Sequence, residues 1–251
     1  MKRAMVTGAG SGLGRAVAAG LAARGCAVAL VDIDEKAIRA MAAGLAHAHC
    51  IPQDLTAPGG PATAVTRVIA ALGGLDIVVN NAGYGAGEAF LDLDEANWDR
   101  TLDLNLKATA FICAAAGRHM RDAGAGRIVN ITSPASRMAL PNYMAYAASK
   151  AGVDAVTRAA AVALAPFGVR VNSVAPGMMD TPMQRITERQ LAAIEGRNDI
   201  DIFLEERTRR IPIGRRVEIS VVAESVIWLA LDAPEYITAE RLNMSGGLDK
   251  D

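Results

Sequence analysis

"VTGAGSGLGRAVAAGLAARG", residues 6–25, is the stretch that decides the fold. It leaves a short apolar run, passes through Gly8, Gly12 and Gly14, and continues as an alanine-rich segment with helical periodicity. Glycines at such a turn permit a tight bend. They also let backbone amides approach a phosphate at the start of the helix, where the helix dipole favours negative charge. The stretch therefore predicts a strand, a phosphate-binding turn and a helix in direct succession.

Asp32 supplies the second half of the same signal. It follows Gly14 by 18 residues and ends the next apolar run, 26–32. A carboxylate in that place accepts hydrogen bonds from the ribose hydroxyls of NAD and repels the 2′-phosphate of NADP. Ser11 and Ile33 are uncharged, so neither offers a cation to a 2′-phosphate. The sequence therefore predicts a dinucleotide site that takes NAD.

The rest of the chain repeats the alternation of strand and helix. Further continuous apolar runs, typical of buried parallel strands, occupy residues 75–80, 126–132 and 168–175. We expect a doubly wound parallel α/β sheet of the Rossmann type, with about seven strands and helices on both faces, in a single domain over 1–251. The alternation lapses at 178–212, and a long insertion after a late strand predicts a lid over a site.

Composition narrows the function classes. The chain has 251 residues, 51% hydrophobic and 21% charged, with a formal net charge of -1. These values are typical of a soluble globular protein without a polybasic surface, which argues against nucleic acid as a partner. Three cysteines without a CxxC pair give no disulfide framework, and the first apolar run is too short for a signal peptide or membrane span. We expect a cytoplasmic protein with no membrane partner.

The segment "PNYMAYAASKAG", 141–152, contains two tyrosines ahead of a lysine. On a helix Tyr146 and Lys150 are i,i+4 neighbours about 6 Å apart along the axis, whereas Tyr143 lies about two turns from Lys150. An ammonium beside a phenol lowers the phenol pKa from about 10 toward the range useful for proton transfer. Tyr146 is therefore the candidate acid/base, and Tyr143 is a pocket or packing residue.

Five motifs stand in one order along the chain. They are TGxxxGxG at 7–14, NNAG at 80–83, Ser133, YAASK at 146–150 and PGMMDT at 176–181. In order and approximate spacing they resemble the motifs of the short-chain dehydrogenase/reductases, and the resemblance spans nearly the whole chain. It implies an oxidoreductase that acts on CH–OH donors with a nicotinamide cofactor, often as a homo-oligomer, a tetramer or a dimer.

The resemblance also implies four catalytic residues. Tyr146 would be the general acid/base, and Lys150 would bind the nicotinamide ribose and lower the tyrosine pKa. Ser133 would hydrogen-bond the substrate oxygen, and Asn105 would hold a water in a proton relay behind the lysine. The chemistry agrees, because hydride transfer from an alcohol requires a base that removes the hydroxyl proton as the hydride departs.

Cofactor and substrate contacts follow from the same resemblance. Asp54 would touch the adenine ring with Leu55 packed nearby, Asn81 would steady the sheet, and Thr181 would bond the nicotinamide carboxamide. The predicted cofactor set is Gly8, Ser11, Gly12, Leu13, Gly14, Asp32, Ile33, Asp54, Leu55, Asn81, Ala82, Gly83, Tyr146, Lys150, Pro176, Gly177, Met179 and Thr181. The predicted substrate contacts are Ser133, Ala135, Tyr143, Tyr146 and Met183.

The substrate is predicted from the lid. Its sequence is long, polar and charged, which favours small polar substrates over a steroid or acyl chain. The lid and "PEYITAERLNMSGG" after it resemble the sugar-alcohol dehydrogenases of the family, so oxidation of a polyol to a ketose is the first expectation. If Arg137 or an arginine among 185, 207, 209 and 210 points inward, an anionic hydroxy substrate with a carboxylate, sulfonate or phosphate is favoured instead.

Three other interpretations stay open or are weakened by particular residues. A 3-oxoacyl reductase would use NADPH, which Asp32 argues against. A catalytically silent NAD-binding sensor or scaffold should have lost Tyr146, Lys150 or Ser133, and this chain has kept them. "HAHC" at 47–50 invites a metal site, but its ligands are crowded, so we expect no metal.

Two positions depart from the family pattern. Ser136 stands where glycine is common, three residues after the catalytic serine, and Ser245 stands where an aspartate is common near the C-terminus. The first difference lies at the substrate pocket. Because of the second, subunit contacts near the C-terminus are not inferred from the family.

Overall fold

Seven parallel strands form one sheet in the computed structural model, which describes residues 1–249. The strands are β1 (Arg3–Thr7), β2 (Ala27–Asp32), β3 (Ala48–Pro52), β4 (Ile77–Asn80), β5 (Gly126–Ile131), β6 (Val169–Pro176) and β7 (Arg241–Met244). Their order across the sheet is β3-β2-β1-β4-β5-β6-β7. This confirms the predicted doubly wound sheet of the Rossmann type.

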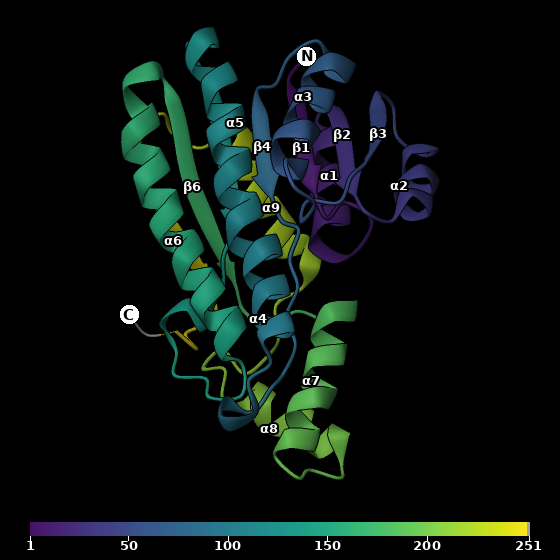
Figure 1. Ribbon diagram of the computed structural model, residues 1–251, viewed down its shortest axis with the longest axis vertical. Coiled ribbons are helices and arrows are strands. Elements are labelled where there is room, and N and C mark those ends of the chain that lie inside the picture. Colours follow the sequence, from purple (N-terminus) through teal and green to yellow (C-terminus); the bar gives the residue numbers. More distant parts are fainter. Residues whose placement is uncertain (250–251) are drawn as a thin grey trace.

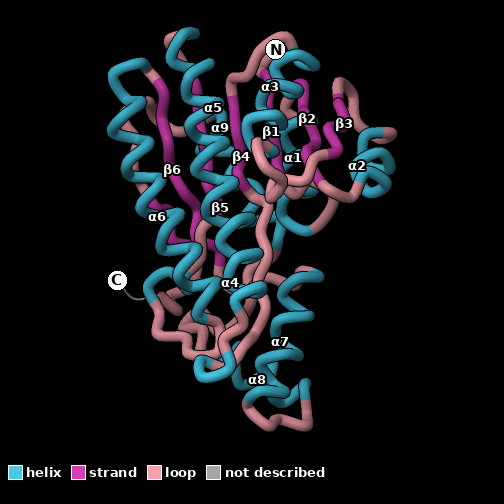
Figure 2. The backbone as a smooth tube through the Cα atoms, viewed as in Figure 1, coloured by secondary structure: helices cyan, strands magenta, loops and turns pink. Residues whose placement is uncertain are grey.

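Helices cover both faces of the sheet (Figure 1, Figure 2). One face is packed by α1 (Gly12–Ala23), α2 (Glu35–Ala42) and α9 (Ile219–Leu231). The other is packed by α3 (Gly60–Leu72), α5 (Ala108–Ala123) and α6 (Met144–Leu164). The chain also forms α4 (Glu95–Leu102), a π-helical turn (Asp103–Lys107), α7 (Pro182–Ile194), α8 (Ile200–Arg209) and short 3-10 turns at Phe90–Asp92, Pro134–Arg137 and Ala165–Phe167.

Alternation along each strand divides the core into two layers. Val6 of β1 is packed with α1 and α9, whereas its neighbour Met5 is packed with α3 and α5. Successive strand side chains point to opposite faces, so a strand buried on both faces must be apolar throughout. This requirement explains why the central strands are continuous apolar runs in the sequence.

The two edge strands do not show that signal. β3 contains His49 and Cys50 and is only partly buried, and no residue of β7 is fully buried. An edge strand covered on fewer sides does not need a continuous apolar run. The sequence therefore predicted the number of strands but not the residue ranges of these two. Within "HAHC", Ala48 begins β3.

The segment predicted as a lid, 178–212, is mostly helical. It contains α7 and α8, which lie at the lower end of the molecule, away from the helices that flank the sheet (Figure 1). These helices share a small apolar cluster of their own, built from Leu191, Ala192 and Phe203. The segment is therefore a packed unit beside the sheet and not an irregular loop.

Two further observations concern the setting of the chain. Within residues 1–249, no helix combines the length and apolar character needed to cross a bilayer. Cys26, Cys50 and Cys113 are free thiols, and Cys26 and Cys113 are buried.

Candidate active site

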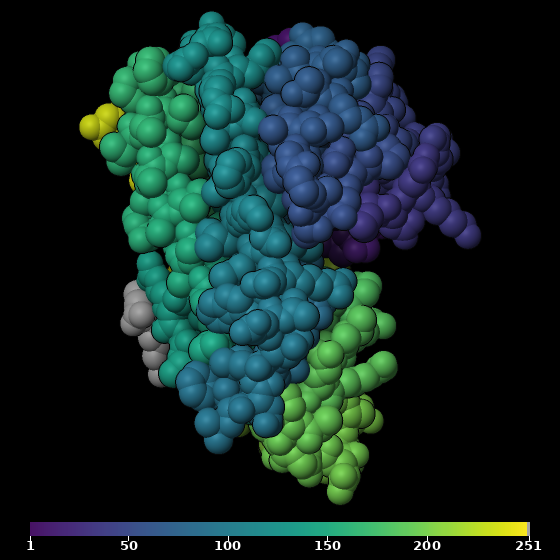
Figure 3. Space-filling model, in the orientation of Figure 1, coloured from purple at the N-terminus to yellow at the C-terminus, as the bar shows by residue number. Residues whose placement is uncertain are grey.

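A cavity of about 710 Å³ lies at the carboxyl ends of the central strands. Its position is next to β1 and β4, where the strand order reverses, and open α/β sheets bind ligands at such a switch point. Residues of α7 and α8 line one side of the cavity. Figure 3 shows an indentation between these helices, in light green, and the purple N-terminal segment. The volume suits a small-molecule site.

Nearly all of the predicted site residues line this cavity. From the cofactor set these are Gly8, Ser11, Gly12, Leu13, Asp32, Ile33, Asp54, Leu55, Asn81, Ala82, Gly83, Tyr146, Lys150, Pro176, Gly177, Met179 and Thr181. From the substrate set they are Ser133, Ala135, Tyr143, Tyr146 and Met183. Gly14 and Asn105 do not line the cavity, and both lie behind its wall.

The glycine turn is shaped by close backbone approach. Gly8 has a φ of 64° and Gly12 a φ of 51°, a left-handed conformation that favours glycine. A Cβ on Gly14 would lie 2.2 Å from the carbonyl oxygen of Gly8, so Gly14 lets the first turn of α1 pack onto the loop. Its role in the fold is therefore packing, while Gly8 and Gly12 form the cradle that faces the cavity.

The carboxylate of Asp32 is held in place at the end of β2. One oxygen accepts a hydrogen bond from the Gly10 amide at 2.8 Å, and the other accepts from the Asp34 amide at 3.0 Å. None of the cavity-lining residues between Gly8 and Thr56 is a lysine or an arginine. This end of the cavity is therefore acidic.

Two residues join the predicted adenine end to the sheet. Asp54 accepts hydrogen bonds from the Thr56 side chain at 2.7 Å and the Thr56 amide at 2.8 Å, which hold the pKa of Asp54 below its usual value. Asn81 donates to the carbonyl oxygens of Thr7 at 3.0 Å and Gly8 at 3.3 Å. Asn81 therefore ties the end of β4 to the glycine turn, which agrees with the structural role expected for it.

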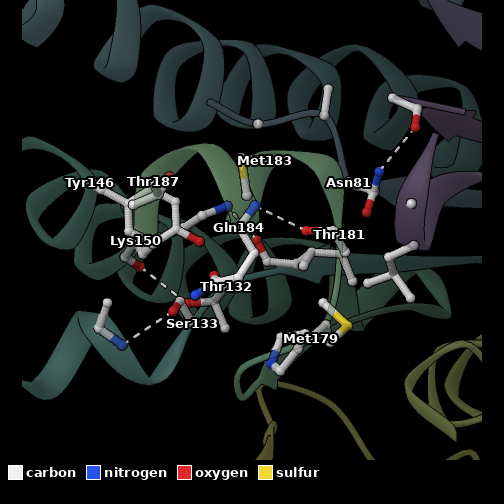
Figure 4. A pocket seen from close by; sticks show the side chains of 18 of the residues that line it. Asn81, Thr132, Ser133, Tyr146, Lys150, Met179, Thr181, Met183, Gln184 and Thr187 are labelled. Carbon is white, nitrogen blue, oxygen red and sulfur yellow. Dashed lines mark hydrogen bonds between the residues drawn. The ribbon is translucent and has the colours of Figure 1, made fainter. Parts of the chain in front are cut away.

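Ser133, Tyr146 and Lys150 lie together at the other end (Figure 4). Ser133 follows β5, and the other two belong to the first turns of α6. The Ser133 hydroxyl is close enough to the Tyr146 phenol to act on its pKa. Lys150 places Nζ 5.5 Å from the centroid of the Tyr146 ring and donates to the Ile131 carbonyl at 2.9 Å. The i,i+4 geometry expected from the sequence is therefore present.

Burial governs the pKa values of this group. It raises the pKa of Tyr146, and the neighbouring Ser133 hydroxyl opposes that shift. Burial also lowers the pKa of Lys150 to about 8, against the opposing charge of Asp154. Burial therefore dominates the pKa of Tyr146 in the chain alone, and the expected lowering by Lys150 stays a prediction.

Asn105 lies behind the cavity wall in the π-helical turn, a feature often found at functional sites. Its Nδ2 donates to the Tyr84 carbonyl at 2.8 Å and to Ser149 Oγ at 2.9 Å, and its Oδ1 accepts from the Tyr84 amide at 2.7 Å. These bonds use both amide protons and leave a second lone pair on Oδ1. A Cβ on Gly83 would lie 3.4 Å from Asn105 Oδ1 and 3.7 Å from Lys150 Nζ, so Gly83 separates the two side chains.

Tyr143 packs against the candidate acid/base residue. Its ring is stacked on that of Tyr146, with centroids 4.4 Å apart and planes at 17°. Burial raises the pKa of Tyr143, and the neighbouring Thr187 hydroxyl opposes the shift. Thr187 donates to the Gly85 carbonyl at 3.0 Å. Tyr143 is therefore a wall residue that lies beside α7.

Sequence reasoning missed part of the wall, which comes from α4, from the segment before α6 and from α7. The additional lining residues include Arg100, Met138, Leu140, Gln184, Thr187 and Leu191. Among the arginines left open by the sequence, Arg207 and Arg210 line the cavity, whereas Arg137 lines a separate, smaller one. Exposed Arg185 and Arg209 pair with Asp180 and Glu205. Helical periodicity alone does not reveal which face of α8 packs against the sheet domain.

Comparison with known proteins places this geometry in a family. The family model described as Enoyl-(Acyl carrier protein) reductase matches residues 8–249. Cis-4-hydroxycyclohexanecarboxylate dehydrogenase of Sinomonas cyclohexanicum is 38% identical over 248 residues, 97% of this chain and 95% of that protein. The chain belongs to the short-chain dehydrogenase/reductase family.

Two further members of the short-chain dehydrogenase/reductase family are similar over nearly their whole length. D-threitol dehydrogenase of Mycolicibacterium smegmatis is 35% identical over 98% of this chain and 92% of that protein. A crystal structure of an NAD+-bound xylitol dehydrogenase superimposes with a TM-score of 0.91 at 31% identity, covering 98% of each chain. The predicted family, fold and enzyme class are thereby confirmed.

Proposed function

We propose that this short-chain dehydrogenase/reductase interconverts a small polar secondary alcohol and its ketone, with NAD as the preferred hydride carrier. The observation that carries the proposal is the grouping of Ser133, Tyr146 and Lys150 at one end of a cavity whose other end holds Asp32. The glycine turn fits a dinucleotide, since Gly8 and Gly12 line the cavity with left-handed backbone and a Cβ on Gly8 would lie 2.9 Å from Ala82 Cα.

The chain's own residues manage the proton and the orientation of the substrate. When bound, NAD supplies the hydride acceptor and, in its oxidised form, a positive charge. The Ser133 hydroxyl donates to the substrate oxygen and holds it beside Tyr146. Tyr146 Oη accepts the hydroxyl proton as the carbon–hydrogen bond breaks, so the alcohol loses one proton and one hydride. Lys150 stabilises the phenolate form of Tyr146 that accepts this proton, and Asn105 Oδ1 binds a water that continues the proton path behind it.

NAD is proposed over NADP because of the charge near Asp32. Its carboxylate is already oriented by two backbone amides, and no lining lysine or arginine between Gly8 and Thr56 offers a partner to a 2′-phosphate. A fixed negative charge disfavours the phosphorylated ribose more than it favours the plain one. The xylitol dehydrogenase structure, which contains NAD+, agrees with this assignment.

The substrate class rests on the polar lid and on relatives. Those named above act, by their names, on D-threitol, xylitol and a hydroxycyclohexanecarboxylate, which are all small polar secondary alcohols. Polyol oxidation and hydroxy acid oxidation both fall within the proposal. We also propose a single domain with its lid at 178–212, a cytoplasmic location and a homo-oligomeric state, the last of which sedimentation velocity of the purified protein measures directly.

The proposal is tested by incubating the purified protein with NAD and a panel of polyols, diols and hydroxy acids while NADH absorbance is followed. We expect saturable NADH formation with at least one secondary alcohol and much slower turnover with NADP. Absence of NADH formation with every alcohol, in a protein that binds NADH, would support the silent NAD-binding protein instead.

A further inference from the structure

The charges that line the cavity are divided between its two ends. Its only lining carboxylates within residues 1–249 are Asp32 and Asp54, which follow β2 and β3. Its lining cations come from later segments and are Arg100, Lys150, Arg207 and Arg210. The part of the cavity beyond the predicted nucleotide end therefore carries an excess of positive charge.

A buried carboxylate on α7 does not cancel that excess. Glu188 is 1% exposed and accepts two hydrogen bonds from Arg216, at 2.8 and 3.1 Å. Gln184 donates a third hydrogen bond to Glu188 at 3.0 Å. A carboxylate that is paired with a bidentate arginine and accepts a third hydrogen bond has its charge balanced and its acceptor positions occupied. Glu188 is thus already neutralised without help from Arg207.

Arg207 is the second cation beside this pair. Its Nε lies 3.8 Å from Glu188 Oε1, which is too far for a hydrogen bond. Among the described residues this buried Nε has no hydrogen-bond partner, although the side chain is only 22% exposed. The charges that act on Arg207 are those of Glu188, Glu195, Arg210 and Arg216, so three cations, Arg207 included, face two carboxylates and one positive charge is in excess. Holding a half-buried cation without a matching anion costs free energy, so an anion bound beside Arg207 would be stabilising.

The surroundings of Arg207 orient it toward the reaction site. Its guanidinium carbon lies 5.5 Å from the centroid of the Phe203 ring, within the range of a cation–π contact. Its charge acts on the Tyr143 phenol, whose ring is stacked on Tyr146. Burial lowers the pKa of Arg207, as expected for a cation held out of water. Arg207 is therefore fixed at the tyrosine end of the cavity.

We propose that Arg207 binds a carboxylate of the substrate, so that the physiological substrate is a small hydroxy acid and not a neutral polyol. This inference rests on the function proposed above and specifies its substrate class. A single excess charge matches a monoanion, and the planar guanidinium fork matches the two oxygens of a carboxylate. Arg210, exposed at the same cavity, adds to the field that attracts an anion.

The experiment compares acids with neutral partners of the same shape. The probes are 4-hydroxycyclohexanecarboxylate and 3-hydroxybutyrate, each beside its carboxamide, with NAD as cofactor. We expect kcat/KM to favour the acid by about 10- to 100-fold, the size of a charge-assisted hydrogen-bonded pair. Raising the ionic strength should increase KM for the acids and leave KM for the amides nearly unchanged.

Substitution at the arginine separates binding from chemistry. Arg207→Gln should raise KM for the acids about tenfold or more with little change in kcat, and leave the amides nearly unaffected. Arg207→Lys should recover part of the loss, because it keeps the charge but not the fork. Arg209→Gln is the matched control, since Arg209 lies on the same helix, is exposed and pairs with Glu205. It should behave as wild type with all four probes.

Calorimetry provides a readout that does not depend on turnover. Cyclohexanecarboxylate should bind the NADH complex of the wild type and bind the Arg207→Gln complex at least tenfold more weakly. Equal kcat/KM for acids and amides, or equal binding by both proteins, overturns the assignment to Arg207. If no alcohol at all is oxidised, the proposed function fails instead, and the calorimetric comparison still decides whether Arg207 holds a carboxylate.

Discussion

Tyr146 and Tyr143 show how two residues of one type in one short segment come to do different work. Both are half-buried and their rings are stacked 4.4 Å apart. Tyr146 lies beside Ser133 and near Lys150, whereas Tyr143 lies beside Thr187 of α7. Only Tyr146 therefore has a substrate-orienting hydroxyl and a cation as neighbours.

Removing each hydroxyl in turn tests that difference. Tyr146→Phe should lower kcat by about 10²–10⁴-fold, the usual contribution of general acid–base catalysis, while NADH binding is kept. Tyr143→Phe should mainly change KM, since it alters the pocket wall. The measurement is steady-state kinetics with fluorescence titration of NADH. An inactive Tyr143→Phe beside an active Tyr146→Phe would reverse the assignment.

Lys150 gives a pH-dependent stability whose sign follows from its burial. Its pKa falls from 10.5 in the unfolded chain to about 8 in the fold. Between these values the unfolded chain binds more protons, so the free energy of unfolding rises with pH in that window. Lys150→Met lacks the titrating group. Urea unfolding at several pH values should therefore show wild type gaining stability relative to Lys150→Met from about pH 8 to about pH 10, and a gain on lowering the pH would contradict this.

Asp32 supports a prediction about cofactor choice. Asp32→Ala removes the acceptor for the NAD ribose and the charge that repels the 2′-phosphate of NADP. The preference for NAD, as a ratio of kcat/KM values, should narrow by about tenfold or more, since hydrogen bonds to a charged group contribute about 1.5–3 kcal/mol. A wild-type enzyme that prefers NADP would show the cofactor assignment to be mistaken.

At the scale of elements, the sequence predicted best those strands that are buried on both faces of the sheet. Continuous apolar runs located β1, β2, β4, β5 and β6, because both faces of a central parallel strand are covered. The exposed sides of β3 and β7 removed that signal. The inward face of α8 was equally hidden, because it depends on Phe203 packing against α7, which is a tertiary contact. The raised pKa of Tyr146 was missed for the same reason, since burial is not a local property.

The departure at Ser136 has a structural explanation. Ser136 donates a hydrogen bond to Asp154 of α6 at 2.6 Å. Arg241 of β7 lies 3.4 Å from Asp154, donates to Asp249 at 2.6 Å, and donates to the Ser133 carbonyl at 3.1 Å. These contacts clamp the turn that carries Ser133 between α6 and the last strand. The clamp therefore positions Ser133 from behind the cavity.

Breaking this clamp should cost more than breaking a surface pair. Arg241→Met leaves two buried carboxylates without their cation, which should lower the free energy of unfolding by about 3–5 kcal/mol. The control is Arg24→Met, since Arg24 and Asp232 form an exposed pair expected to contribute about 1 kcal/mol or less. Urea denaturation measures both. Equal losses of unfolding free energy in the two variants would show that the contacts of Arg241 contribute no more than an exposed ion pair.

At the scale of the molecule, the topology brings distant segments to one cavity. The glycine turn and Asp32 arrive from the first two strands, Ser133 from β5, and Tyr146 and Lys150 from α6. The reversal of strand order beside β1 leaves room for them to meet. The segment 178–212 adds a wall with excess positive charge opposite the acidic end of the cavity. Motif order in the sequence predicted the first part, and only the fold shows the second.

The central claim is that the protein moves a hydride from a secondary alcohol carbon to NAD. The most direct measurement uses a substrate of the panel that carries deuterium on that carbon, with mass spectrometry of the reduced cofactor. We predict that wild-type enzyme produces NADH containing one deuterium and the corresponding ketone in equal amounts, and that Tyr146→Phe produces neither at a comparable rate. NADH without deuterium, or ketone formed without NADH, would contradict the account.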